Sequence, residues 1–413
     1  MKIIFIALSF LSAFLLFVIQ PMMGKLALPY FGGGTQIWNT CLLFFQSCLL
    51  TSYFYTYVLM NFVRFKLTII IHLLLLMGSI FVVYKSSFQF SGPIDFENPK
   101  TALILFFIKE IGFQIFLLGC TAPLIQFWYG RIKRDEPYYL YSSSNLGSLL
   151  GLLIYPTIVS IFLGLNIQLK LWPLTYIIFV ITFYVLGISV FNSKNKQKYT
   201  NKANIKTPFK IKFKWSFYSM LPTILLYSVT AHLTRNIAPI PLLWVAPLLL
   251  YLGSFILAFS GRLKKYSDKL GRVICLPVVM TVIMYVTNVT RPISFVMLIY
   301  LISFFLVSCF CHKVVYDSRP DKNQLANYYL CVCFGGFLGG ILVTYLFIYL
   351  FNSLIEIPLT FILICVLRSD IKRVSLSKRD IIFPLIIILL TYFCLTMRYH
   401  ISASLGIILK TVL

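Results

Sequence analysis

Residues 192–214 have the sequence NSKNKQKYTNKANIKTPFKIKFK, a polar and strongly basic stretch in a chain that is otherwise mostly apolar. The stretch is too short and too polar to bury a core of its own. On both sides of it lie apolar runs of about 20 residues, the length that a helix needs to cross the hydrocarbon core of a bilayer. We therefore expect residues 192–214 to link two membrane-embedded halves.

The apolar runs predict an all-α polytopic membrane protein of about 13–14 transmembrane helices. They lack the period-two alternation of strands, and only helices and closed barrels satisfy the backbone in lipid. The expected spans lie near 3–23, 38–60, 66–84, 102–128, 140–163 and 171–191, then near 217–235, 241–260, 273–289, 292–311, 327–350 and 354–367, with a thirteenth at 381–397. Residues 399–413 are short for a fourteenth. The expected regions are a first half (1–191), a basic cytoplasmic linker (192–214), a second half (215–367) and a C-terminal hydrophobic extension (368–413).

Lysine and arginine alternate between rich and poor connections along the whole chain. If the first run leaves the cytoplasm, the N-terminus and the even connections carry 27 of the 36 basic residues. The odd connections carry seven: Lys25, Lys85, Lys100, Lys170, Arg235, Arg291 and Arg398. Basic residues near span ends are retained on the cytoplasmic side during insertion. We expect a bacterial inner-membrane protein with its N-terminus in the cytoplasm.

The composition excludes several classes of protein. With 60% hydrophobic and 11% charged residues and a mean hydropathy of +0.90, the chain cannot have the polar surface of a soluble domain. Its net charge of +25 lies in short loops beside the spans, which favours the lipid bilayer as partner and not nucleic acid. Most cysteines lie inside apolar runs, and the Cys309-x-Cys311 and Cys331-x-Cys333 pairs lack the two-residue gap of a zinc knuckle. We expect neither a metal nor a cofactor.

An internal repeat supports the two halves. Residues 139–151 (YLYSSSNLGSLLG) align without gaps with residues 328–340 (YYLCVCFGGFLGG), 189 positions later. An even number of spans per half gives parallel, MFS-like repeats, as in major facilitator transporters. Small residues on one helix face allow close helix approach in lipid. Helix packing is therefore expected at Gly147, Gly151, Gly335, Gly336, Gly339 and Gly340, with a substrate path along the same face as the alternative.

Polar residues inside the spans are few and mark a candidate pathway. Glu110 is the only acid that we place within a span. It is either an interfacial residue beside a snorkelling Lys109 or a proton or cation site. Histidine titrates near neutrality, but a lone membrane histidine is more often a packing residue. The pathway candidates are Gln20, Gln46, Glu110, Gln114, Gln126, Asn145, Thr230 and His232.

Several ordered motifs resemble a known family. They are SAFLLFVIQPMMGK (12–25), IWNTCLLFFQ (37–46), TAPLIQFW (121–128), YYLYSSSNLGS (138–148), TAHLT (230–234), PLLWV (241–245) and the glycine run 335–340. Over roughly residues 8–350 the chain is similar to the integral-membrane spermidine synthase-like proteins, often described as fused major facilitator/spermidine synthase proteins. The resemblance implies a transporter-like membrane domain and a link to polyamines.

The chain departs from that family after residue 350. Family members commonly carry a C-terminal aminopropyltransferase domain of Rossmann type, which needs a glycine-rich loop and carboxylates, whereas the only acids here are Glu356, Asp370 and Asp380. We therefore expect the membrane part alone, and no enzyme. The favoured function is secondary transport of a small solute, for which a polyamine or related cation is one candidate. The alternative is a scaffold that anchors a separately encoded aminopropyltransferase. A membrane enzyme acting on a lipid or quinone-like substrate is a third hypothesis, for which no nucleophile–base arrangement is seen.

Overall fold

The computed structural model describes residues 2–367 except 87, 89–97, 133–137, 194–206, 237–242, 262, 264–266, 290–291, 321–323 and 352. Every regular element within these residues is helical. The span expected at 381–397 and most of the expected linker lie outside the described residues.

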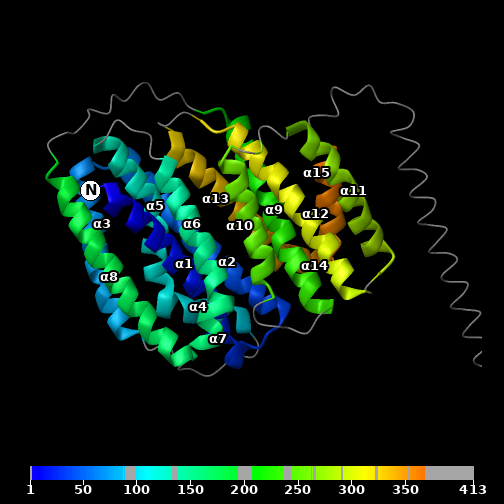
Figure 1. Ribbon diagram of the computed structural model, residues 1–413, viewed down its shortest axis with the longest axis horizontal. Helices are drawn as coiled ribbons and strands as arrows, with labels where there is room; N and C mark the ends of the chain where they lie inside the picture. The colour runs from blue at the N-terminus through cyan, green and yellow to red at the C-terminus, as the bar shows by residue number, and fades with distance from the viewer. Residues whose placement is uncertain are drawn as a thin grey trace, which may run out of the picture.

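Six membrane-crossing units make up the first half (Figure 1). Their bounds are α1 (Lys2–Phe31), α2 (Thr35–Phe62), α3 (Phe65–Lys85), the continuous series α4 (Pro99–Phe107), η1 (Ile108–Gly112) and α5 (Phe113–Ile132), the series α6 (Tyr138–Ile154), η2 (Tyr155–Val159) and α7 (Ser160–Phe162), and α8 (Leu165–Phe191).

The second half repeats this order. Its units are α9 (Phe209–Asn236), α10 (Val245–Phe259), α11 (Ser267–Val286), α12 (Ile293–Asp317), the series α13 (Leu325–Ile341), η5 (Leu342–Leu346) and α14 (Phe347–Leu350), and α15 (Glu356–Val366). Eight of the described helical segments are long and apolar enough to cross a membrane, and three more are shorter apolar helices. Helix α9 begins inside the segment expected as linker, because residues 209–214 extend the helix beyond its apolar part.

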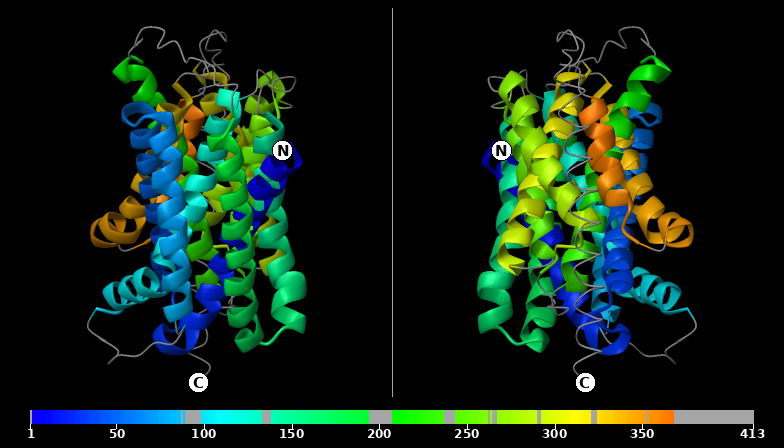
Figure 2. Two further views of the ribbon diagram at one scale, coloured as in Figure 1. Left: turned by 90° about the vertical axis from the view of Figure 1, so that its left-hand side faces the viewer. Right: turned by 90° about the vertical axis from the view of Figure 1, so that its right-hand side faces the viewer.

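The helix contacts show that the two halves have the same architecture. In the first half α1 contacts α5, α6 and α8, and α3 contacts α8; in the second half α9 contacts α12, α13 and α15, and α11 contacts α15. Between the halves, α2 packs on α13 and α6 packs on α10. In both pairs the second span of one half contacts the fifth span of the other half. The two six-helix halves lie side by side (Figures 1 and 2), and their equivalent contacts indicate a pseudo-twofold relation between them. Over the described residues the predicted all-α, MFS-like fold class is confirmed.

Glycines allow close helix contacts in each half. A Cβ on Gly147 would collide with the Phe10 carbonyl, and one on Gly151 would lie 2.7 Å from the Phe14 carbonyl oxygen. On α13, a Cβ on Gly335 would collide with the Ser216 carbonyl, and one on Gly339 would lie 2.8 Å from the Met220 carbonyl oxygen.

These contacts correct the register of the sequence repeat. Gly147 corresponds to Gly335 and Gly151 to Gly339, an offset of 188 and not 189. The doubled glycines of α13 produce identities in both registers, so the alignment alone selects the wrong one. Gly336 and Gly340 lie one residue further round the helix and face other neighbours.

Within the part of the chain that the structure describes, three spans contain a π-helical segment: η1 in the fourth, η2 in the fifth and η5 in the eleventh. Segments η2 and η5 occupy equivalent places, directly after α6 and α13. Such segments often occur at functional sites, because the local change of register redirects the helix and its side chains. Helices α6 and α13, which both contact the opposite half, are therefore each followed by a π-helical segment at the same place.

Candidate functional site

A line of polar side chains lies where α2 faces α9 across the boundary between the halves. Thr35, Asn39 and Gln46 share one face of α2, because separations of 4 and 11 residues return to nearly the same side of a helix. The Thr35 and Thr234 hydroxyls lie 3.5 Å apart, and the Tyr227 hydroxyl donates a hydrogen bond of 3.1 Å to Gln46 Oε1. We call these five residues the polar seam.

Asn39 occupies the middle of the polar seam. It is buried, and its Oδ1 accepts no hydrogen bond from any described residue. It lies about 6 Å along the helix from Thr35 and about 10 Å from Gln46, at 1.5 Å per residue. A buried acceptor without a donor is costly, so the polar seam has a free acceptor that a bound molecule with a donor group could satisfy.

Helix α13 closes the polar seam on a third side, and Gly340 is the point of contact. A Cβ at Gly340 would lie 2.7 Å from Gln46 Oε1 and 2.9 Å from the Tyr227 hydroxyl. Glycine therefore leaves the room in which this pair forms. The pair joins the first half to the second, since α2 carries Gln46 and α9 carries Tyr227.

Two tryptophans close the interface at the end of the bundle opposite the N-terminus. Trp38 on α2 and Trp244, just before α10, are buried, and their ring centroids are 5.6 Å apart. A Cβ on Gly24 of α1 would lie 2.7 Å from a Trp38 ring carbon and 3.6 Å from a Trp244 ring carbon. The two tryptophans begin the second helix of each half, so the pair is related by the same pseudo-twofold axis. We call them the tryptophan pair.

The indole nitrogens of the tryptophan pair differ. Trp38 Nε1 donates to the Gly33 carbonyl at 2.9 Å, which anchors its ring to the connection between α1 and α2. Trp244 Nε1 is buried and donates to no described residue. Two buried groups near the tryptophan pair therefore have no hydrogen-bond partner among the described residues: the donor Trp244 Nε1 and the acceptor Asn39 Oδ1.

The structure brings some of the predicted pathway residues to this interface. Gln46 belongs to the polar seam. Thr230 lies on α9 one turn from Thr234, but its hydroxyl donates to the Leu226 carbonyl of its own helix at 2.6 Å. Gln20 is buried on α1, one turn from the Gly24 that faces the tryptophan pair.

The other predicted polar residues lie elsewhere. Gln114 is buried on α5, and its Oε1 accepts no hydrogen bond from the described residues, while Gln126 on α5 and Asn145 on α6 are half-buried. His232 is half-buried and stacks on Tyr300 of α12, with ring centroids 4.3 Å apart. These four residues therefore lie outside the polar seam as defined above.

Glu110 lies in η1 and ties the fourth span to the end of α3. Its Oε2 accepts a 2.8 Å hydrogen bond from the Phe88 amide, and its carbonyl accepts one of 2.9 Å from the Ser86 hydroxyl. Lys109 Nζ lies 3.7 Å from Glu110 Oε1, with a side chain that is 65% exposed against 1% for Glu110. Glu110 thus combines a buried carboxylate with a snorkelling neighbour.

The expectation that Glu110 is the only acid within a span is wrong. Glu356 is buried at the start of α15, and its Oε1 accepts a 3.1 Å hydrogen bond from the Ser228 hydroxyl of α9. Glu356 was not predicted as a buried acid because it lies near the expected start of the span, where charged side chains ordinarily face the membrane interface.

Sequence reasoning missed Asn39, Tyr227 and the pairing of the two tryptophans. The polar period along residues 35–46 could have identified Asn39, whereas Tyr227 gave no signal in an aromatic-rich chain. His312 was also missed as a polar residue: its Nδ1 lies 3.0 Å from the Ser254 hydroxyl, and its ring packs edge-on against Tyr251 at 5.0 Å. Within the described residues no three His, Cys, Asp or Glu side chains gather in a way that could hold a metal ion.

No family model matches the chain, and no curated protein matches it. Among solved structures it is similar to the crystal structure of a mutant of the nucleoside transporter NupG, with 12% sequence identity and a TM-score of 0.49 over 88% of this chain and 96% of that one. A likeness at this level carries no inference about a solute. The site is therefore interpreted from its own geometry.

Proposed function

We propose that this multi-pass membrane protein is a gradient-driven transporter that moves a small solute through the interface between its two halves. The observation that carries the proposal is the polar seam. It lies on the pseudo-twofold boundary between the halves, it contains the unsatisfied Asn39 acceptor, and the tryptophan pair closes it at one end. We further propose that the chain itself catalyses no reaction, and that it lies in a bacterial inner membrane with a cytoplasmic N-terminus.

The geometry suggests how alternating access would proceed. Transporters of two parallel halves expose a central site by rocking one half against the other. In this chain the motion must separate Thr35 from Thr234 and Trp38 from Trp244 at the closed end. The Gln46–Tyr227 hydrogen bond also spans the halves, so solute groups would replace it when the halves part.

The chemistry of the interface favours an uncharged solute with hydrogen-bonding groups. Helices α2, α6, α9, α10 and α13, with segment η5, form the main contacts between the halves, and none of them contains an Asp or Glu. Amide, hydroxyl and indole groups remain as partners. A polyamine, the solute that the family resemblance suggests, would depend on aromatic faces and neutral acceptors in place of carboxylates. It is the second candidate.

The proposal is tested with purified protein in proteoliposomes. Uptake of labelled spermidine, putrescine and a panel of uncharged polar solutes is measured with the double variant T35C/T234C, whose hydroxyl positions are close enough for a disulfide. We expect uptake in the reduced state, loss of uptake on oxidation and recovery on reduction. The single variants T35C and T234C, oxidised in the same way, are the controls.

Two results would contradict transport. One is uptake that persists when the double variant is fully cross-linked; the other is no uptake of any tested solute by intact protein in liposomes, under every imposed ion gradient. If spermidine were the only solute taken up, transport would stand, and the proposed substrate would be a polyamine and not an uncharged solute.

A second candidate function is the scaffold for a separately encoded aminopropyltransferase. The observation that favours it is the set of exposed lysines where α9 begins, Lys210 and Lys214, at the same end of the bundle as the N-terminus. A synthase encoded beside this chain would then co-purify with it in detergent. Failure to do so at physiological salt would remove this candidate.

A further inference from the structure

Helix α9 is longer than a membrane crossing requires. Its 28 residues extend about 42 Å, whereas the hydrocarbon core is about 30 Å thick. The excess lies at the start of the helix, where Lys210, Lys212 and Lys214 precede the apolar part. Figure 2 shows the green start of α9 projecting beyond the bundle, at the end that also carries the N-terminus.

The projecting turns carry a stripe of phenylalanine. Phe209, Phe213 and Phe217 follow one another at four-residue intervals, with ring centroids 6.4 Å and 5.6 Å apart. Phe209 is 81% exposed and Phe213 is 56% exposed. At 100° per residue, Lys210 and Lys214 border this stripe on one side and Lys212 borders it on the other.

Trp215 fixes the base of this segment. The Trp215 ring is fully buried, donates from Nε1 to the Ser318 carbonyl at 2.9 Å, and packs at 90° against Tyr328 with centroids 5.0 Å apart. Tyr328 in turn donates to the Val315 carbonyl at 3.1 Å. The first turns of α9 are therefore held at a fixed angle by α12 and α13.

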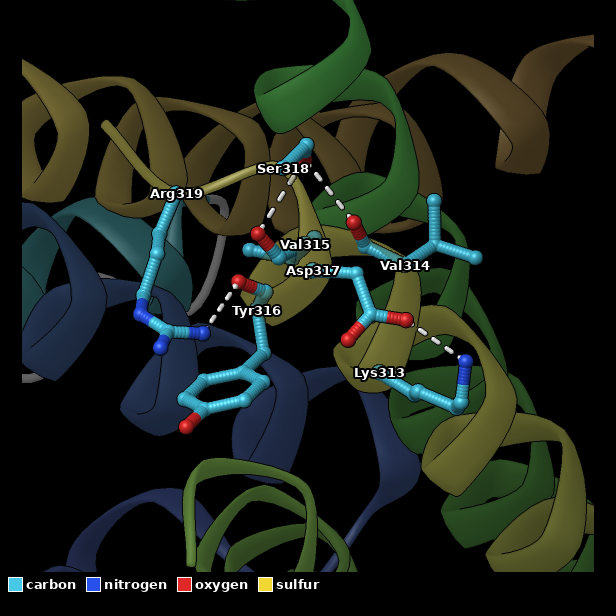
Figure 3. A network of polar contacts seen from close by, with 7 residues as sticks. All are labelled: Lys313, Val314, Val315, Tyr316, Asp317, Ser318 and Arg319. Atoms are coloured by element: carbon cyan, nitrogen blue, oxygen red, sulfur yellow. Dashed lines mark hydrogen bonds and ion pairs between the residues drawn. The ribbon is translucent and has the colours of Figure 1, made fainter. Parts of the chain in front are cut away.

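The end of α12, to which Trp215 is bonded, is itself held by local contacts (Figure 3). Ser318 donates to the Val314 carbonyl at 2.8 Å, and the Arg319 guanidinium lies 3.8 Å from the centre of the Tyr316 ring. Asp317 accepts from Lys313 Nζ at 2.6 Å. Asp317 therefore already has a cationic partner in Lys313. Its charge is not available to neutralise the lysines at the start of α9.

We infer that residues 209–217 form a binding site for anionic phospholipid in the adjacent leaflet. A helix with exposed aromatic rings on one face and lysines beside them has the pattern of a segment that lies in the membrane interface. The phenylalanine rings lie at the level of the headgroups, at the boundary with the acyl region, and the three ammonium groups contact the phosphates. Lysines at this depth attract anionic lipid electrostatically.

The test uses the full-length protein in detergent with added phosphatidylglycerol or phosphatidylcholine. Bound lipids are counted by native mass spectrometry, and the thermal stability is followed in parallel. We expect wild type to retain phosphatidylglycerol in preference to phosphatidylcholine, and K210Q/K212Q/K214Q to bind it about tenfold more weakly or worse. K210R/K212R/K214R keeps the charge and should restore binding.

Two further variants complete the design. F209S/F213S keeps the lysines and should weaken retention of both lipids, because it removes the apolar anchor. K85Q/K100Q/K170Q removes three lysines from helix ends at the other end of the bundle, and should leave phosphatidylglycerol binding at the wild-type level. Equal retention of the two lipids by wild type would overturn the inference. So would unchanged binding in K210Q/K212Q/K214Q, or equal loss in the control variant.

Discussion

At the residue scale, the space left by Gly340 decides whether the Gln46–Tyr227 hydrogen bond can form. In G340A the new methyl group would lie 2.7 Å from Gln46 Oε1 and 2.9 Å from the Tyr227 hydroxyl, so both side chains must move. We expect a loss of about 1–3 kcal/mol in the free energy of unfolding and a lower uptake rate in proteoliposomes. G336A is the matched control, because its Cβ meets only Thr223 Oγ1 at 3.6 Å; equal effects of the two substitutions would contradict the role of Gly340.

The strength of the Gln46–Tyr227 bond can be measured separately from its role in transport. Interhelical hydrogen bonds in membrane proteins average about 0.6 kcal/mol and reach about 1.7 kcal/mol. A double-mutant cycle with Q46L and Y227F should therefore give a coupling energy of about 0.6 kcal/mol, measured by unfolding in mixed micelles. A coupling energy of zero would show that the 3.1 Å contact does not join the halves. Y251F, a neighbouring phenol outside the polar seam, should show no coupling to Q46L.

The sequence identified part of this site because polar atoms are rare in lipid. Gln46 and Gln20 were predicted on that basis and lie at or beside the interface, whereas Gln126, Asn145 and His232 met the same criterion and lie outside the polar seam. Burial inside a span constrains a polar residue but does not say which helix it faces. Which helix a polar residue faces depends on how α2 packs against α9 and α13. A single sequence does not reveal this packing.

At the element scale, glycine controls how closely the paired helices approach. The carbonyl oxygen of Phe10 occupies the place where a Cβ on Gly147 would be, and Ser216 stands in the same relation to Gly335. Since backbone atoms cannot rotate away as a side chain can, the helices themselves must separate. We expect G147A and G335A each to cost about 2–3 kcal/mol in the free energy of unfolding.

G130A provides the comparison for both substitutions. Gly130 lies near the end of α5 with no heavy atom within 4 Å of its hypothetical Cβ. Alanine also has the higher helix propensity, by about 1 kcal/mol, so G130A should be neutral or stabilising. Thermal unfolding of the three variants in one detergent checks the prediction, and similar melting temperatures for G130A and G147A would refute it.

Each of the twelve helical units that the structure describes in the two halves overlaps an apolar run expected as a span. Hydropathy was less informative at two places. The start of α9 lies at Phe209 and not near 217, because lysines that extend a helix beyond the membrane resemble a linker in a hydropathy profile. The π-helical segments η2 and η5 were not predicted, since a change of hydrogen-bond register leaves the apolar content of a span unchanged.

At the scale of the whole molecule, the alternation of apolar runs and the glycine repeat together predicted two parallel halves, and the helix contacts repeat accordingly. The register of the repeat was wrong by one residue, as the helix contacts of Gly147 and Gly335 show. The pairing of Trp38 with Trp244 could not be derived from either half alone. It exists only because the pseudo-twofold axis brings two equivalent helix starts together, 5.6 Å apart between ring centroids.

The proposed orientation of the whole bundle rests on where its basic residues gather. Arg64 and Arg131 stand at helix ends on the same side as Lys2, since successive spans alternate in direction. Retention of lysine and arginine in the cytoplasm during insertion is the basis for our proposal that this end lies inside the cell. Alkaline phosphatase fused after Arg64 or Arg131 should be inactive, because it folds only outside the cytoplasm, whereas fusions after Lys85 or Lys170 should be active. Green fluorescent protein fused at the same four positions should give the reverse pattern, and an active phosphatase after Arg64 would invert the orientation proposed for the entire molecule.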